Sequence, residues 1–150
     1  MTSSFVYPTN TEVVRGEAHC FDPDNGDYEQ FGRKDSINVA KNFCSNDPIL
    51  EADGDTIPDH YKNDLGVSTH IVVRWATDQS NCAAKGTYHF AASEDFPCER
   101  LFDINYFCDV SAALSYGGGY VLNTPSSGCI EINLWATIPG ANDRLDIRRS

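Results

Sequence analysis

Six cysteines are the residues whose chemistry decides most about this chain, because thiols bind metals, act as nucleophiles or pair as disulfides. They stand at Cys20, Cys44, Cys82, Cys98, Cys108 and Cys129. Zinc sites favour cysteines only a few residues apart, and the closest spacing here, from Cys98 to Cys108, is wider. No segment around a cysteine matches a nucleophile motif, whereas an even number in an acidic chain of this size indicates disulfides. We therefore predict that all six are paired, with free structural thiols as the alternative.

The sequence allows many pairings of six cysteines. The preferred pairs join cysteines at the two ends of one local segment: 20–44, 82–98 and 108–129. Each bridge would close a loop of about 15 to 25 residues, which is worth about 3 kcal/mol on the chain-entropy estimate.

An acidic segment has part of the spacing of a calcium loop. Its candidate ligands, at the first, third, fifth and ninth positions, are Glu51, Asp53, Asp55 and Asp59. Thr56 replaces the glycine that makes the sharp turn of such loops, and Lys62 replaces the bidentate glutamate. A solvated acidic loop is therefore favoured, and we predict neither a bound metal nor a cofactor.

Hydrolytic chemistry has weaker support. Glycosidases need two carboxyl groups across a cleft, and among 22 acidic residues suitable pairs arise by chance. The four histidines are accompanied by no Gly-x-Ser-x-Gly elbow. A small secreted hydrolase acting on glycans remains an alternative to a module without catalysis.

The expected strands point several polar and aromatic side chains to one sheet face. Alternation in a strand sends successive side chains to opposite faces. The resulting candidate binding face contains Trp135, Asn133, Glu131, His89, Arg74 and His70. A tryptophan surrounded by polar groups suits a carbohydrate or peptide ligand. The other interpretation is that an N-terminal arm covers this face and buries Trp135 beneath Phe5 or Val6.

Hydrophobic periodicity predicts the elements that would carry these residues. Strands are expected at 69–77, 87–91, 120–123 and 129–136, with the first two joined by a hairpin loop at 78–86. Helices are expected at 35–45, capped by Asp35 or Ser36, and at 95–108. The run 117–119 is three glycines and predicts a break.

This order predicts an α+β fold: a disulfide-stabilised two-layer α/β sandwich with two helices on one face of a four-stranded antiparallel sheet. An all-β sandwich is the alternative. The chain length suits a single domain at 17–138, with an N-terminal arm at 1–16, an acidic insertion loop at 46–66 and a polar tail at 139–150.

The net charge of −11 argues against nucleic acid and anionic membranes as partners, since both require a basic face. The sequence has no long apolar run, so we predict no membrane span.

Cysteine, glycine and aromatic positions resemble a family of fungal secreted modules. The matching features are Cys20 with its acidic loop, the segment 42–44, Cys98 before Leu101 and Phe102, the pair 108–109, the segment 116–119, and Cys129 with Trp135. The chain resembles uncharacterised domains found alone or C-terminal to secreted hydrolases of fungi, and is loosely similar to killer-toxin-like and effector-like α/β sandwiches. The resemblance covers about residues 17–138 and carries no catalytic residue.

We therefore expect a secreted, extracellular, effector-like module that binds cell-wall polysaccharide or a host protein. A purely structural accessory domain of a larger secreted enzyme is a further alternative.

Overall fold

The computed structural model describes residues 2–3, 18–21, 29–92, 96–102, 109–111, 114–115 and 117–137. The predicted tail, most of the predicted arm and Cys108 lie outside these ranges.

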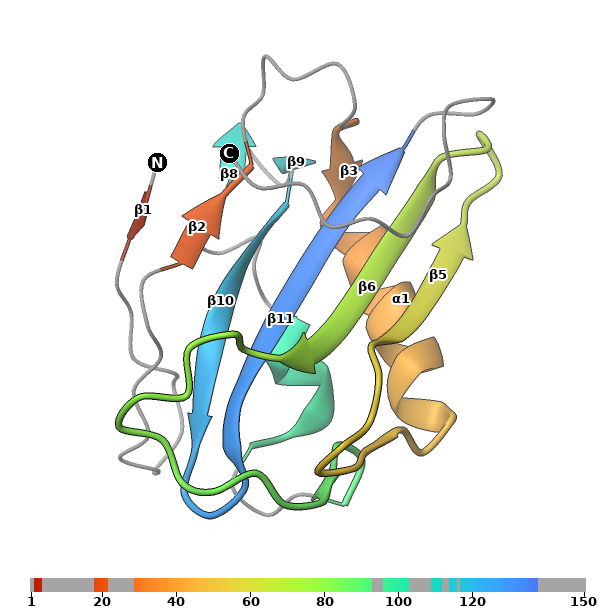
Figure 1. Cartoon of the computed structure of the whole chain (residues 1–150). Helices are drawn as coiled ribbons and strands as arrows, with labels where there is room; N and C mark the ends of the chain where they lie inside the picture. The colour runs from red at the N-terminus through yellow and green to blue at the C-terminus, as the bar shows by residue number, and fades with distance from the viewer. Residues whose placement is uncertain are drawn as a thin grey trace.

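The main sheet has six antiparallel strands in the order β1–β2–β10–β11–β6–β5 (Figure 1). The bounds are Thr2–Ser3 for β1, Ala18–Cys20 for β2, Gly118–Thr124 for β10, Gly128–Thr137 for β11, Ser68–Trp75 for β6 and Ile57–Lys62 for β5. The strands predicted at 69–77, 120–123 and 129–136 are confirmed as β6, β10 and β11. Their alternating β-branched and aromatic residues fit the pleated surface of a half-buried sheet.

The glycine run does not break the chain where predicted, because β10 begins at Gly118. Gly117 precedes it with φ 84°, and a Cβ there would lie 2.0 Å from the carbonyl oxygen of Leu134. Gly119 lies close to Asn133, since a Cβ on Gly119 would be 2.4 Å from Oδ1 of that residue. These glycines let β10 approach β11, which places them inside the sheet.

The predicted insertion loop at 46–66 contains two strands. One is β5, the edge of the main sheet, and the other is β4 (Ile49–Leu50). Along β5 half-buried residues alternate with exposed ones, and Pro58 is exposed. Proline is tolerated on an edge strand because its missing N–H would have faced away from the sheet.

The strand predicted at 87–91 is short and pairs elsewhere. It is β7 (Tyr88–His89), which pairs with β4 in a two-stranded sheet, so the predicted hairpin with 69–77 is wrong. A further small sheet contains β3 (Phe31–Gly32), β9 (Leu114–Ser115) and β8 (Asp109–Ser111).

The helix predicted at 35–45 is confirmed as α1 (Arg33–Ser45), which buries a stripe of side chains at Ser36, Val39, Ala40 and Phe43. Its N-cap is Gly32 without a side-chain cap, so the predicted cap by Asp35 or Ser36 is wrong. In place of the helix predicted at 95–108, the structure has a 3₁₀-helix, η1 (Cys98–Phe102), while 103–108 lie outside the described residues. In the described ranges no helix is long and apolar enough to cross a membrane.

The main core lies between the sheet and α1, which packs against β5, β6 and η1 (Figure 1). Phe43 of α1 meets Phe90 and Phe102 edge to face, with ring centroids 5.3 and 5.2 Å away. The hydroxyl of Tyr120 donates to the carbonyl of Leu101 at 2.7 Å. The described chain is therefore a mostly β, α+β fold with one α-helix, where two had been predicted.

Disulfides link elements that are distant in sequence. Cys44 of α1 pairs with Cys98 of η1, and Cys82 pairs with Cys129 of β11. Cys20 is disulfide-bonded as well, so no described cysteine is a free thiol. The predicted pairs 20–44, 82–98 and 108–129 are therefore wrong. The prediction joined neighbours in sequence, whereas α1 and η1 are neighbours in space, and the two bridges span separations of 54 and 47 residues.

Candidate functional site

The face predicted to bind a ligand is largely buried. Trp135, Asn133 and His70 are each 2% exposed, and Glu131 is 6% exposed. His89 is exposed but belongs to β7, which is not part of the main sheet. Alternation along β6 and β11 puts the other predicted residues on one face, but it does not report whether that face is covered.

Trp135 belongs to a second, smaller core on this face. It packs with Phe21 and Val72, and its ring lies 6.5 Å from that of Phe21 in an edge-to-face contact. His70 stacks on Trp135 with centroids 5.3 Å apart, and its Nε2 lies 3.0 Å from the hydroxyl of Thr137. Trp135 is therefore not an exposed platform. Phe5 and Val6, the residues expected to cover it, lie outside the described ranges.

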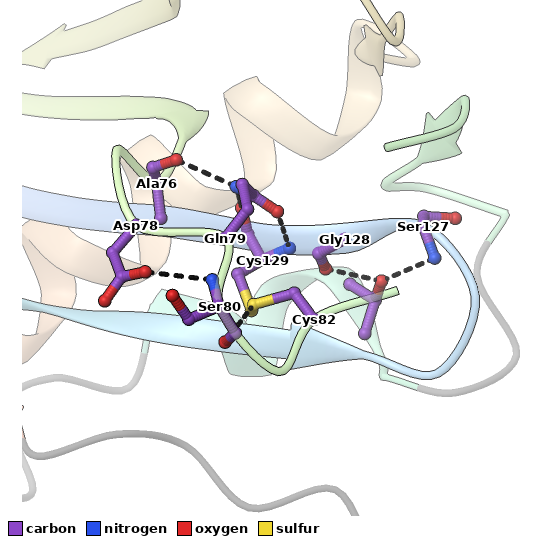
Figure 2. Close-up of a disulfide and its surroundings, with 9 residues drawn as sticks. Ala76, Asp78, Gln79, Ser80, Cys82, Ser127, Gly128 and Cys129 are labelled. Carbon is purple, nitrogen blue, oxygen red and sulfur yellow. Dashed lines mark hydrogen bonds between the residues drawn. A yellow bond between two sulfur atoms is a disulfide. The ribbon is translucent and has the colours of Figure 1, made fainter. Parts of the chain in front are cut away.

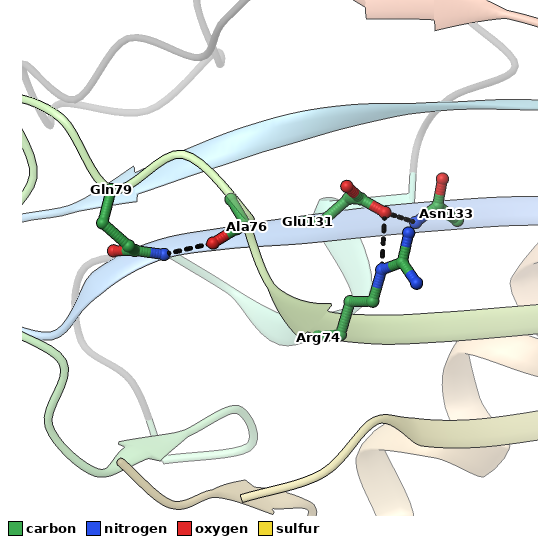
Figure 3. A network of polar contacts seen from close by, with 5 residues as sticks. All are labelled: Arg74, Ala76, Gln79, Glu131 and Asn133. Carbon is green, nitrogen blue, oxygen red and sulfur yellow. Dashed lines mark hydrogen bonds and ion pairs between the residues drawn. The ribbon is translucent and has the colours of Figure 1, made fainter. Parts of the chain in front are cut away.

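Arg74 and Glu131 form an ion pair across strands β6 and β11 (Figure 3). Nε of Arg74 donates to Oε1 of Glu131 at 2.9 Å, and the side-chain amide of Asn133 donates to the same oxygen at 3.1 Å. The Glu131 side chain is 8% exposed and that of Arg74 is 36% exposed. The guanidinium thus compensates a buried carboxylate, which is a structural role on this face.

The calcium candidates are not brought together. Glu51 accepts a hydrogen bond from the hydroxyl of Thr87 at 3.0 Å. Asp59 accepts bonds from Asn46 and from the backbone N–H of His60, at 3.3 and 2.7 Å. Asp53 and Asp55 are exposed, and no group of three or more potential ligands in the described part of the chain could hold a metal ion.

A different tryptophan reaches the surface. Trp75, the last residue of β6, packs against the main core but stays partly exposed. Its indole N–H donates to the carbonyl of Glu51 at 2.8 Å, and the ammonium of Lys85 lies 5.9 Å from its ring centroid.

We call Trp75, Glu51, Lys85 and Thr87 the Trp75 surface. Glu51, Lys85 and Thr87 are exposed residues. The sequence signal that could have revealed this surface is the polar segment 77–81, which begins two residues after Trp75.

The loop beside the Trp75 surface is fixed to β11 by several bonds (Figure 2). The Cys82–Cys129 disulfide is one of them. The side chain of Gln79 donates to the carbonyls of Ala76 and Cys129, both at 2.8 Å, and accepts from the backbone N–H of Cys129 at 3.0 Å. Gly128 lies against the ring, since a Cβ there would be 3.2 Å from Cζ3 of Trp75. The indole is therefore held in one position by the surrounding backbone.

Asp78 lies at the start of the same loop and organises its turn. The backbone N–H of Ser80 donates to its carboxylate at 2.9 Å. Hydrogen bonds from the hydroxyl and the backbone of Ser80 hold the pKa of Asp78 below its ordinary value, because they stabilise the charged form.

Comparison with known proteins found no matching family model, no similar curated protein and no similar solved structure. The functional proposal therefore rests on the structure of the chain.

Proposed function

We propose that this chain is a secreted, non-catalytic binding module that contacts its ligand, a cell-wall carbohydrate or a host protein, through the Trp75 surface. The observation that carries the proposal is the partly exposed indole of Trp75, at the end of β6 and beside a disulfide-linked loop. The exposed residue Glu51 accepts from the indole N–H through its backbone carbonyl, and the Lys85 ammonium lies 5.9 Å from the ring centroid. An aromatic ring combined with a few fixed polar groups is what binding sites use to hold and orient a ligand.

Secretion is supported by the disulfides, since they persist in oxidising compartments. A role without catalysis is supported by the carboxylates of Asp59 and Glu131. Each accepts a hydrogen bond from a neighbouring side chain, which gives it a structural function.

Retention on insoluble chitin, β-glucan and cellulose, with a glycan array alongside, tests the proposal. We expect Trp75→Ala to lose retention. Leu65→Ala is the matched control, because Leu65 is 83% exposed at a turn between β5 and β6 and lies outside the proposed surface. Retention that survives Trp75→Ala, in a variant shown by circular dichroism to be folded, would contradict the proposal.

A further inference from the structure

The groups around Trp75 limit the charge that its ligand can carry. The chain has 22 acidic and 11 basic residues, and its net charge of −11 repels polyanions. Glu51, whose backbone carbonyl accepts from the indole N–H, is an exposed acidic residue. Asp53 and Asp78 are also exposed, two residues from Glu51 and three residues from Trp75 in the sequence. Polysaccharides that carry carboxylate or sulfate groups are therefore poor ligands here.

A cationic ligand meets a different obstacle. The ammonium of Lys85 already lies over the indole, 5.9 Å from the ring centroid, where a cation is attracted by the π-system. A second ammonium on the same ring would be repelled by Lys85. Amino-sugar polymers with free amines are thus also disfavoured.

The remaining hydrogen-bonding capacity matches hydroxyl groups. Oε1 of Glu51 accepts from Thr87, and no described residue bonds to Oε2 of this exposed residue. Lys85 is exposed and makes no hydrogen bond to the described residues. A sugar hydroxyl both donates and accepts, so it can satisfy the two groups together. An apolar peptide side chain would instead leave both of them desolvated and unpaired.

We propose that the ligand of the Trp75 surface is an uncharged pyranose chain, an inference that rests on the proposed function. A sugar contacts the exposed part of the Trp75 indole, Lys85 donates a hydrogen bond to it and Glu51 accepts one. Thr87 positions the Glu51 carboxylate through the 3.0 Å hydrogen bond between them.

The experiment compares soluble oligosaccharides of three charges with the intact chain by isothermal titration calorimetry. The neutral probes are oligomers of glucose and of N-acetylglucosamine, the acidic probe is oligogalacturonate and the basic probe is a glucosamine oligomer. We expect the neutral oligomers to bind most tightly. Glu51→Gln and Lys85→Ala should each weaken that binding about tenfold, the loss expected for one hydrogen bond to a charged group. Leu65→Ala should bind as the unaltered chain does.

A second readout reports directly on the ring. Trp135→Phe leaves Trp75 as the single tryptophan, because the chain contains two, and the neutral oligomers should shift its fluorescence emission. Trp135 is buried, so the unaltered chain is titrated in parallel in case this variant folds poorly.

The outcomes separate the inference from the proposed function. Tighter binding of the acidic or basic oligomer, with a response from Trp75, would leave the binding function in place and overturn the uncharged ligand. Binding of a neutral oligomer that is insensitive to Trp75→Ala would overturn both. An absence of heat and of fluorescence change with every oligosaccharide at millimolar concentration would overturn the carbohydrate ligand, and a host protein would then be the remaining class for the proposed function.

Discussion

The two tryptophans allow the burial of the second sheet face to be measured. Trp135 is 2% exposed. Burying a tryptophan removes about 150 to 250 Å² from water, worth about 4 to 6 kcal/mol at about 25 cal/mol per Å². Measured truncations of core aromatics cost about 3 to 5 kcal/mol. We therefore expect Trp135→Ala to lower the free energy of unfolding by about 4 kcal/mol.

Trp75→Ala is the matched comparison. Its ring is partly exposed, and the variant loses part of a burial contribution and one hydrogen bond to the Glu51 carbonyl. We expect a cost of about 2 kcal/mol, half that of Trp135→Ala. Urea unfolding followed by far-ultraviolet circular dichroism, without reductant, measures both. A typical domain is stabilised by about 5 to 15 kcal/mol, so the loss expected for Trp135→Ala is a substantial part of the total. A more conservative substitution is therefore measured as well.

Single-tryptophan variants supply this more conservative substitution. Trp75→Phe leaves only Trp135 to emit, and Trp135→Phe leaves only Trp75. Acrylamide should quench Trp75 more steeply than Trp135, and Trp135 should emit at the shorter wavelength because little water reaches it. If Trp135 is quenched as steeply as Trp75, or if Trp135→Ala costs less than about 1 kcal/mol, the second core around Phe21 and Val72 is refuted.

Three further changes test individual contacts. Arg74→Ala should lower the free energy of unfolding by about 2 kcal/mol, because it leaves the buried Glu131 carboxylate without its cation, and by less in a Glu131→Gln background. Equal losses in the two backgrounds, measured by urea unfolding, would contradict the coupling of Arg74 to Glu131. Asn81 has φ 61°, so Asn81→Ala should lower the free energy of unfolding by about 1 kcal/mol, whereas Asn81→Gly should lower it by less than about 0.5 kcal/mol. Equal melting temperatures of the two variants would contradict a cost that arises from the left-handed backbone. Ser80→Ala should raise the pKa of Asp78 toward 3.8, as measured by a carboxyl NMR titration. Because the folded pKa is depressed, the stability that Ser80 adds is present above the unfolded pKa and is lost as the pH falls through the folded pKa. An unchanged pKa of Asp78 would show that the depression has another cause.

Strong periodicity predicted the elements of the sheet centre and the helix. β6 and β11 are rich in β-branched residues, and α1 carries Val39, Ala40 and Phe43 on one stripe. Each pattern is local, so a window of a few residues contains the information. β5 was missed because Pro58 and the surrounding acidic residues are typical of loops, although a proline suits an edge strand.

The disulfides and the cover of the second face depend on long-range packing. Cys44 meets Cys98 because α1 packs on η1, which no spacing of cysteines reveals. Likewise, β11 alternates Ile130, Ile132 and Leu134 with polar residues, yet every residue of the strand is buried. Its polar side is compensated by pairing, as between Glu131 and Arg74, so polarity did not mean exposure here.

The edge of the main sheet at β5 bears on how the proposed binding module would meet a partner. An open edge can bind an extended peptide as an added strand, through backbone N–H and C=O groups. At β5, Pro58 has no N–H to offer, and the N–H of His60 already donates to the Asp59 carboxylate at 2.7 Å. Proline and charged side chains are common means by which proteins blunt an edge against pairing. Strand addition at this edge is therefore disfavoured. The proposed ligand would therefore be recognised through side chains. On the Trp75 surface the Lys85 ammonium lies 5.9 Å from the ring centroid, and Glu51 bonds to the indole N–H through its backbone carbonyl and to Thr87 through its carboxylate.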